Sequence, residues 1–197
     1  MKIIICLALV ISFHTTVFAQ ITDDFENGQL NGWYSEGDGT SALTAAPSGP
    51  GSSLEVADNA TGNINYAIAP AKYLGDWSAF TTMDSLIADF YVDCNDPDVL
   101  DTPFPVFEIS GPGGRASALI GQQIPRNTWN ELTVKLDPAV WTIQSGDWNS
   151  ILADVEVLRI RAEFITGSER VYLDNINLSG TPIYSTITDD ECAIFET

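Results

Sequence analysis

Short runs in which apolar and polar residues alternate cover most of this 197-residue chain. The runs are rich in β-branched and aromatic residues, and clusters of Gly, Pro, Asn, Asp and Ser separate them. Alternation with a period of two is typical of strands that bury one face. The pattern predicts strands over residues 21–25, 32–35, 41–45, 53–57, 63–69, 86–92, 106–110, 116–121, 131–136, 157–166 and 171–178.

This succession of short strands predicts an all-β fold of two packed antiparallel sheets, a sandwich or jelly roll, rather than an up-and-down barrel. The helix of note is predicted over 147–154, where Ser145 or Asp147 can cap the first turn. In such folds the first and last strands commonly lie near each other. We therefore expect Asp24 and Glu26 to come within reach of Asp174.

Two segments alternate especially clearly, so one face of each should be core and the other solvent or groove. The opposed sets are Leu158, Ile160, Ala162 and Phe164 against Arg159, Arg161 and Glu163, and Ile64, Tyr66 and Ile68 against Asn63, Asn65 and Ala67. The two arginines could bind a ligand or balance the acidic charge of the chain. We favour charge balance and hydrogen bonding inside the sandwich.

A carboxylate interrupts the last predicted strand, 171–178. Strict alternation places Asp174 on one face with Tyr172, Ile176 and Leu178. An ionised, unpaired carboxylate on an apolar face would cost several kcal/mol. Asp174 must therefore be neutral, accept hydrogen bonds or bind a cation.

The first 19 residues have the pattern of a secretory signal: Lys2, an apolar run too short to span a bilayer, and small residues at positions −3 and −1 of a cleavage site after Ala19. We expect export, one domain over 20–178 and a C-terminal tail over 179–197. The formal charge of −19 argues against nucleic acid and anionic membrane surfaces as partners.

The single histidine, His14, lies inside the predicted signal. The mature chain would then lack imidazole, which excludes Ser-His-Asp and Cys-His catalysis and histidine zinc sites. Two cysteines, Cys94 and Cys192, remain in a compartment that permits oxidation. They either form a disulfide or remain two thiols.

The run from Tyr66 to Ser78, with its Ala-Pro and Tyr-Leu-Gly-Asp-Trp-Ser pieces, resembles a signature of the laminin B (laminin IV type A) domain family and its bacterial relatives. The segments 24–26, 32–33, 49–54 and 151–163 extend the resemblance in the same order. The resemblance implies a galactose-binding-like jelly roll without catalytic machinery. The chain departs from the family pattern at 80–84 and 93–101, and it lacks flanking cysteine-rich repeats.

The resemblance also bears on Asp174, because galactose-binding-like modules often carry a structural ion near their first and last strands. We predict a structural calcium site with Glu26 and Asp174 as ligands and Ser53 or backbone carbonyls completing the oxygen shell. In the alternative, Asp174 caps a turn or accepts backbone N–H bonds.

Aromatic side chains suggest a binding surface, although they are also the largest core fillers. We assign Trp33 and Trp129 to the core, and we expect Trp77, Trp141 and Trp148 to form an exposed ligand-binding platform.

Three functional hypotheses follow. The first is a secreted, non-catalytic binding or adhesion module for extracellular polysaccharide or a surface protein. The second is a structural or assembly subunit of an extracellular complex. The third is a glycoside-active enzyme that uses paired carboxylates, and we place it last because an acidic chain brings such pairs together by chance.

Overall fold

The computed structural model describes residues 20–58, 64–94, 104–120, 124–165 and 168–179. The predicted signal, the tail after Ser179, Cys192 and most of the acidic segment 93–101 lie outside these residues. No helix in the described part of the chain is long and apolar enough to cross a membrane.

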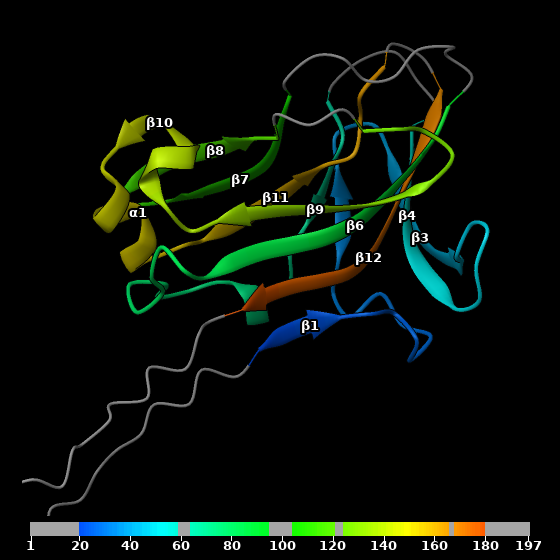
Figure 1. Cartoon of the computed structure of the whole chain (residues 1–197), viewed down its shortest axis with the longest axis horizontal. Helices are drawn as coiled ribbons and strands as arrows, with labels where there is room; N and C mark the ends of the chain where they lie inside the picture. The colour runs from blue at the N-terminus through cyan, green and yellow to red at the C-terminus, as the bar shows by residue number, and fades with distance from the viewer. Residues whose placement is uncertain (1–19, 59–63, 95–103, 121–123, 166–167, 180–197) are drawn as a thin grey trace, which may run out of the picture.

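Two antiparallel sheets pack face to face and confirm the predicted sandwich (Figure 1). Sheet A has the order β3-β4-β12-β6-β9, with β1 also paired to β12. Its strands are β1 (Ile21–Asp23), β3 (Thr40–Ala45), β4 (Ser52–Asp58), β6 (Ser85–Asp93), β9 (Trp129–Lys135) and β12 (Glu169–Ser179).

Sheet B has the order β10-β8-β7-β11-β5-β2. Its strands are β2 (Tyr34–Glu36), β5 (Tyr66–Ile68), β7 (Pro105–Gly111), β8 (Gly114–Leu119), β10 (Trp141–Gly146) and β11 (Val157–Arg161). Three short helices connect strands, namely η1 (Ala71–Tyr73), η2 (Pro138–Val140) and α1 (Trp148–Ala153). Asp147, one of the two predicted cap candidates, caps α1 by accepting the Ser150 amide.

The core lies between the two sheets. Sheet A contributes Leu54, Phe90 and Leu173, and sheet B contributes Phe107 and Leu158, all fully buried. The rings of Phe90 and Phe107 meet edge to face across the sandwich, with centroids 6.3 Å apart. The predicted alternation in β11 is therefore correct, with its apolar face inside.

The strand β5 is oriented against its hydropathy. Asn65 and Ala67 face inward and are fully buried, whereas Ile64 is 42% exposed and Tyr66 is half-buried on the outer face. Asn65 is accommodated there because its backbone N–H and C=O and its side-chain oxygen all have partners, although its buried side-chain nitrogen has none among the described residues. Ile64 and Tyr66 are consequently accessible on the outer face, whereas Ile68 on the same face is 4% exposed.

A β-bulge changes the predicted faces of β12. Asn175 adopts the left-handed conformation (φ 47°), and the pairing with β6 shifts between Asp174 and Asn177. Ile176 and Leu178 therefore point into the core while Asp174 stays on the outer face. The expectation that these three residues share a face is wrong, because strict alternation does not survive a bulge.

The bulge lies where β12 changes partner. Before it, residues Glu169 to Leu173 pair with β4; after it, Ile176 to Leu178 pair with β1. The prediction that the first and last strands are neighbours is confirmed.

Candidate ligand-binding site

The outer face of sheet B carries a row of charged and aromatic side chains. Arg159 on β11 lies opposite Glu108 on β7, and Arg161 lies opposite Tyr66 on β5. Tyr66 in turn lies opposite Glu36 on β2. Because directly opposed residues point to the same side of a sheet, four strands present these groups together.

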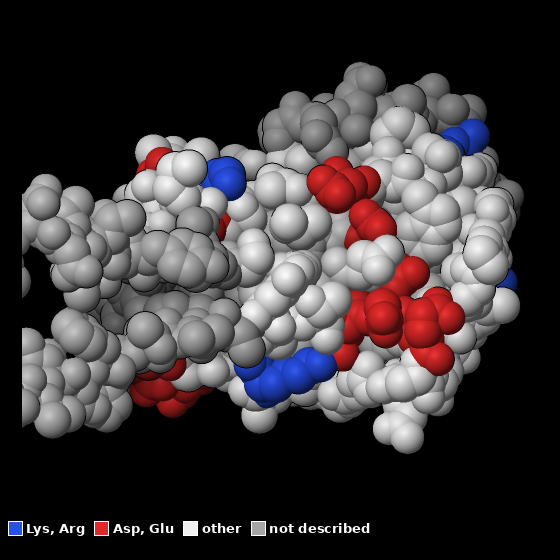
Figure 2. All heavy atoms as spheres, turned by 60° about the horizontal axis from the view of Figure 1, so that its bottom comes forward, with Lys and Arg blue, Asp and Glu red and all other residues white. Residues whose placement is uncertain are grey.

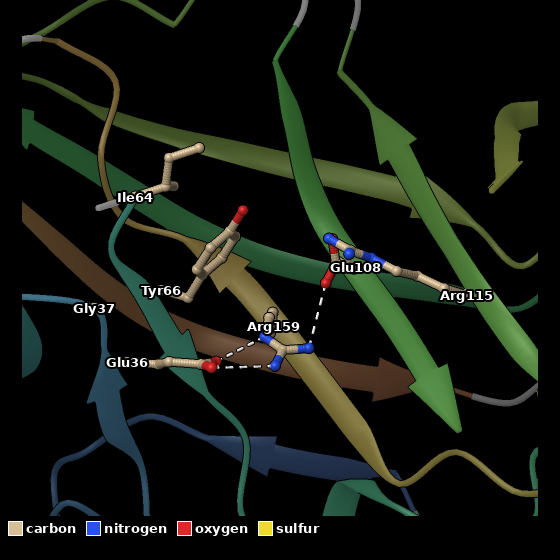
Figure 3. Close-up of a pocket in the computed structure, with 7 residues that line it drawn as sticks. All are labelled: Glu36, Gly37, Ile64, Tyr66, Glu108, Arg115 and Arg159. Carbon is tan, nitrogen blue, oxygen red and sulfur yellow. Dashed lines mark hydrogen bonds and ion pairs between the residues drawn. The ribbon is translucent and has the colours of Figure 1, made fainter. Parts of the chain in front are cut away.

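Arg159 is the centre of this arrangement (Figure 3). Its guanidinium donates to both carboxylate oxygens of Glu36, with Nε–Oε2 at 2.7 Å and Nη2–Oε1 at 3.2 Å. Its third nitrogen, Nη1, lies 3.3 Å from Oε1 of Glu108. A planar guanidinium with three donors engaged has a fixed orientation.

Glu108 lies under two arginines. It is only 5% exposed, and Arg115 on β8 donates to its second oxygen. Each oxygen of this buried carboxylate thus has a cationic partner, which is the condition for keeping a charge out of water. The guanidinium of Arg115 is half exposed and extends the row toward solvent.

The pKa values in this row follow from its contacts. The hydrogen bond from Arg159 lowers the pKa of Glu36, and the same bond raises the pKa of Arg159. Burial, followed by the charge of Glu108, raises the pKa of Tyr66. At neutral pH the row therefore contains fixed ion pairs and a neutral phenol.

These side chains line an open pocket of about 390 Å³. Its walls are Glu36, Gly37, Ile64, Tyr66, Glu108, Arg115 and Arg159 (Figure 3). Tyr34 lies two residues before Glu36 on the same face of β2, and it is 56% exposed. The outer face of sheet B thus combines a pocket of polar groups of fixed orientation with an accessible aromatic ring that lies outside the pocket lining.

The structure does not support the predicted tryptophan platform. Trp77 is 2% exposed and donates from Nε1 to the Tyr73 carbonyl, and Trp141 is 5% exposed and donates to the Lys135 carbonyl. Trp148 is half-buried against Trp141, with ring centroids 5.6 Å apart. Trp77 and Trp141 fill the interior because each ring has apolar contacts and each indole N–H has a backbone carbonyl as acceptor.

The predicted core tryptophans lie as follows. Trp33 is buried and donates to Asp23, as expected. Trp129 is half-buried on the outer face of sheet A, where it packs on Tyr91 and donates to the Pro47 carbonyl. The assignment of Trp129 to the core is therefore wrong.

The predicted cation ligands Glu26, Ser53 and Asp174 lie in one region, where β4, β12 and β1 meet. Ser53 and Asp174 each lie one residue beyond the last pair of the β4–β12 ladder. Burial, which is the largest cause, and the charges of Asp89, Glu26 and Asp24 together raise the pKa of Asp174 to about 6, against the lowering effect of the hydrogen bond from the Asn175 amide. Acidic side chains gather on this face of the molecule (Figure 2).

The donor chemistry of this region suits calcium, because all candidates are hard oxygens. The Ser53 hydroxyl is buried and has no hydrogen-bond partner among the described residues. Asp174 does accept the Asn175 amide at 2.8 Å, and Glu26 accepts the Ser52 amide at 2.9 Å. Within the described ranges no group of three or more His, Cys, Asp or Glu is placed to hold a metal ion, so backbone carbonyls would have to complete a shell.

The sequence pattern indicated Arg159 as a candidate but did not indicate its partners Glu36 and Glu108. Both arginines lie on the outer face of sheet B rather than inside the sandwich, although the expected charge balance is present. Glu108 gave a usable signal, since it interrupts the apolar run Val106 to Ile109 as Asp174 interrupts its own strand. Glu36 and Arg115 gave none, because only the strand order brings them to this face.

No family model matches the sequence, and no curated protein matches it. Solved structures do match. The L4b domain of human laminin alpha-2 aligns with a TM-score of 0.60 and 12% identity over 86% of this chain and 100% of that domain. An exo-beta-agarase aligns with a TM-score of 0.62 and 16% identity over 83% of this chain and 26% of the enzyme.

A family 11 carbohydrate-binding module from a Clostridium thermocellum cellulosomal cellulase aligns with a TM-score of 0.52 and 19% identity, over 84% of this chain and 97% of the module. At these identities the likeness concerns the fold. The chain therefore has the galactose-binding-like jelly-roll fold that the laminin L4b domain and carbohydrate-binding modules share, as the sequence resemblance implied.

Proposed function

We propose that this protein is an exported, non-catalytic carbohydrate-binding module, and that a glycan lies across the pocket on the outer face of sheet B. The observation that carries the proposal is the Glu36–Arg159–Glu108 arrangement beside the exposed ring of Tyr34. The fold supports it, because carbohydrate-binding modules of the same architecture are known, including modules of families 11 and 22. The signal pattern of residues 1–19 supports export.

The chemistry of the pocket suits a sugar. Hydroxyl groups donate and accept hydrogen bonds, and the pocket offers the carboxylate of Glu36, the guanidinium of Arg115 and the phenol of Tyr66. The first two groups are held by ion pairs, so little side-chain entropy is lost when a ligand binds. The ring of Tyr34 offers an apolar face against which a pyranose can stack.

Charge selects the class of glycan. The pocket contains two carboxylates and two guanidiniums, so it is balanced, whereas the whole chain has a formal charge of −19. A uronate or sulfated chain would approach against the field of the protein and find both arginines already engaged by carboxylates. We infer a preference for neutral polysaccharides.

The same contacts argue against glycoside hydrolysis at this site. A glycosidase needs a carboxylic acid with a raised pKa to protonate the leaving group. Hydrogen bonding to Arg159 lowers the pKa of Glu36, and Glu108 is buried beneath two arginines. Neither carboxylate is suited to act as a general acid.

The experiment is a glycan array followed by calorimetric titration with cellohexaose, xylohexaose, a neutral agaro-oligosaccharide and an oligogalacturonate. Tyr34→Ala and Arg115→Ala should each weaken binding of a neutral hit by about tenfold, or 1.4 kcal/mol. Met83→Ala is the matched control, because Met83 is 67% exposed and precedes β6 of sheet A, away from the outer face of sheet B. Absence of binding to every glycan would overturn the proposal and favour the assembly-subunit hypothesis.

A further inference from the structure

Three carboxylates lie close together near one end of the sandwich, outside the pocket. Glu169 at the start of β12 pairs directly with Asp58 at the end of β4, and both are almost fully buried, at 2% and 1% exposed. Glu163 follows β11. The charges of Glu163 and Asp58 both act on Glu169. We call Asp58, Glu163 and Glu169 the acidic cluster. Like charges that face each other across a ladder destabilise it.

Glu169 is almost as fully buried as Asp58, and its carboxylate is only partly hydrogen-bonded. Its Oε1 accepts the Phe164 amide, but its Oε2 is buried without a hydrogen-bond partner among the described residues. The charges that face the cluster are Asp38, from the β2–β3 turn, and Arg161, from β11. Of these two residues Arg161 is the cation. Its guanidinium lies over the Phe104 ring and donates to the Glu163 carbonyl.

These surroundings favour a proton on Glu169. Burial, which is the largest cause, and the charges of Glu163 and Asp58 together raise its pKa to about 7, against the lowering effect of hydrogen bonds from the Phe164 and Ile165 amides. A protonated carboxyl also has no net charge to repel Asp58, which is the residue directly opposite. The ionisation of Glu169 therefore falls within the physiological range of pH.

The acidic cluster is tied to the pocket through Asn65. Glu163 Oε2 accepts the Asn65 amide at 2.8 Å, and the Asn65 side-chain oxygen accepts the Gly39 amide at 2.6 Å. The two segments that Asn65 joins, residues 37–39 and 64–66, contribute Gly37, Ile64 and Tyr66 to the pocket. We call these two segments the pocket rim.

We propose that Glu169 makes the pocket rim sensitive to pH: a protonated Glu169 keeps Glu163 and Asn65 in place, and its ionisation loosens the rim and weakens ligand binding. The effect on binding rests on the proposed function, but the effect on the rim does not. The physical cause is repulsion within the acidic cluster, which displaces Glu163 from the Asn65 amide.

Amide hydrogen exchange followed by NMR tests the rim without any ligand. After correction for intrinsic exchange rates, we expect the protection of the Asn65 and Gly39 amides to fall about tenfold between about pH 5.5 and about pH 8.5. Glu169→Gln should abolish this fall, because a neutral amide replaces the titrating group. Glu156→Gln, the same change at an exposed position, should leave it intact.

A carboxyl ¹³C titration of the wild-type protein needs no variant and covers the case in which Glu169→Gln does not fold. The midpoint for Glu169 should coincide with the midpoint of the loss of protection. Equal protection at both pH values, or a fall that persists in Glu169→Gln, would overturn the proposal. If the rim responds but no oligosaccharide of the panel binds, the proposed function fails while the coupling stands; if one binds, its dissociation constant should rise with the same midpoint.

Discussion

Arg159 reaches across β5 to hold both oxygens of Glu36, a residue 123 positions earlier in the chain. The two residues lie on β11 and β2, which are not neighbours in sheet B, and the ion pair therefore ties three strands together on the outer face. Arg159 also donates to the carboxylate of Glu108, which extends this connection to β7. The pocket walls thus depend on one guanidinium.

Replacing that guanidinium should destabilise the fold. Arg159→Ala leaves Glu108 almost fully buried with Arg115 as its remaining ion-pair partner, and we expect the free energy of unfolding to fall by about 2–4 kcal/mol. Urea unfolding measures this. Arg170→Ala removes a half-exposed arginine that lies 3.8 Å from Glu55 and should cost less than about 1 kcal/mol. Equal losses would contradict the role given to Arg159.

The burial of Trp77 leads to a second prediction. Trp77→Ala should cost about 3–5 kcal/mol, because it opens a cavity and leaves the Tyr73 carbonyl without its indole donor. Tyr34→Ala, the loss of a 56% exposed ring, should cost less than about 1 kcal/mol. Thermal and urea unfolding of both variants would show the contrast. A Trp77→Ala protein as stable as Tyr34→Ala would mean that Trp77 is not a core residue.

The sequence was informative about the fold where hydropathy alternates without interruption. Most strands of the sandwich and the Asp147 cap agree with the local pattern, and the pairing of the first and last strands follows from the fold class. β10 was not predicted, because its residues after Trp141 are all exposed and show no alternation. The pattern did not predict which face of a strand points into the core where local chemistry overrides the alternation. The left-handed Asn175 reverses the inward side of β12, and Asn65 turns a polar residue into the core.

The site was less predictable than the fold for a related reason. An indole is equally suited to a sugar and to a core, so its residue type does not decide where Trp77 or Trp141 lies. The pocket is made by strand order, which brings β2 beside β5 and β11. Local patterning carries no information about that order, and so Glu36 and Arg115 could not be placed beforehand.

The bulge at Asn175 can be tested by side-chain choice. Asn175→Gly should leave the free energy of unfolding nearly unchanged. Glycine adopts a φ of 47° at no steric cost, and this gain offsets the loss of the hydrogen bond from Asn175 to Asp89. Asn175→Val should cost about 2 kcal/mol, since a β-branched residue is strained there. Differential scanning calorimetry provides both values. Similar melting temperatures for the two variants would indicate that the strand does not bulge.

The buried Glu169 predicts a falling stability with rising pH. Its folded pKa of about 7 lies above the ordinary value of 4.5, so the folded state binds more protons between these values and the free energy of unfolding decreases as pH rises through them. We expect a loss of about 1–3 kcal/mol between about pH 5 and about pH 8 from this group. Glu169→Gln should flatten that slope in urea unfolding, and Glu156→Gln should not.

Calcium binding remains a prediction for the region of Glu26, Ser53 and Asp174. Free calcium at about one hundred times its dissociation constant should stabilise the fold by about 2.7 kcal/mol. Asp174→Asn and Glu26→Gln should abolish the increase in melting temperature, whereas Glu156→Gln should retain it. Identical melting temperatures with calcium and with excess chelator would exclude the site.

The central claim is that a neutral glycan binds the outer face of sheet B, and the most direct test is an NMR titration of the protein with cellohexaose and xylohexaose. Amide shifts should change on β2, β5, β7 and β11, around Glu36, Tyr66, Glu108 and Arg159, and Tyr34→Ala should reduce them at a given ligand concentration. Shift changes confined to sheet A, or none with either oligosaccharide, would contradict the account.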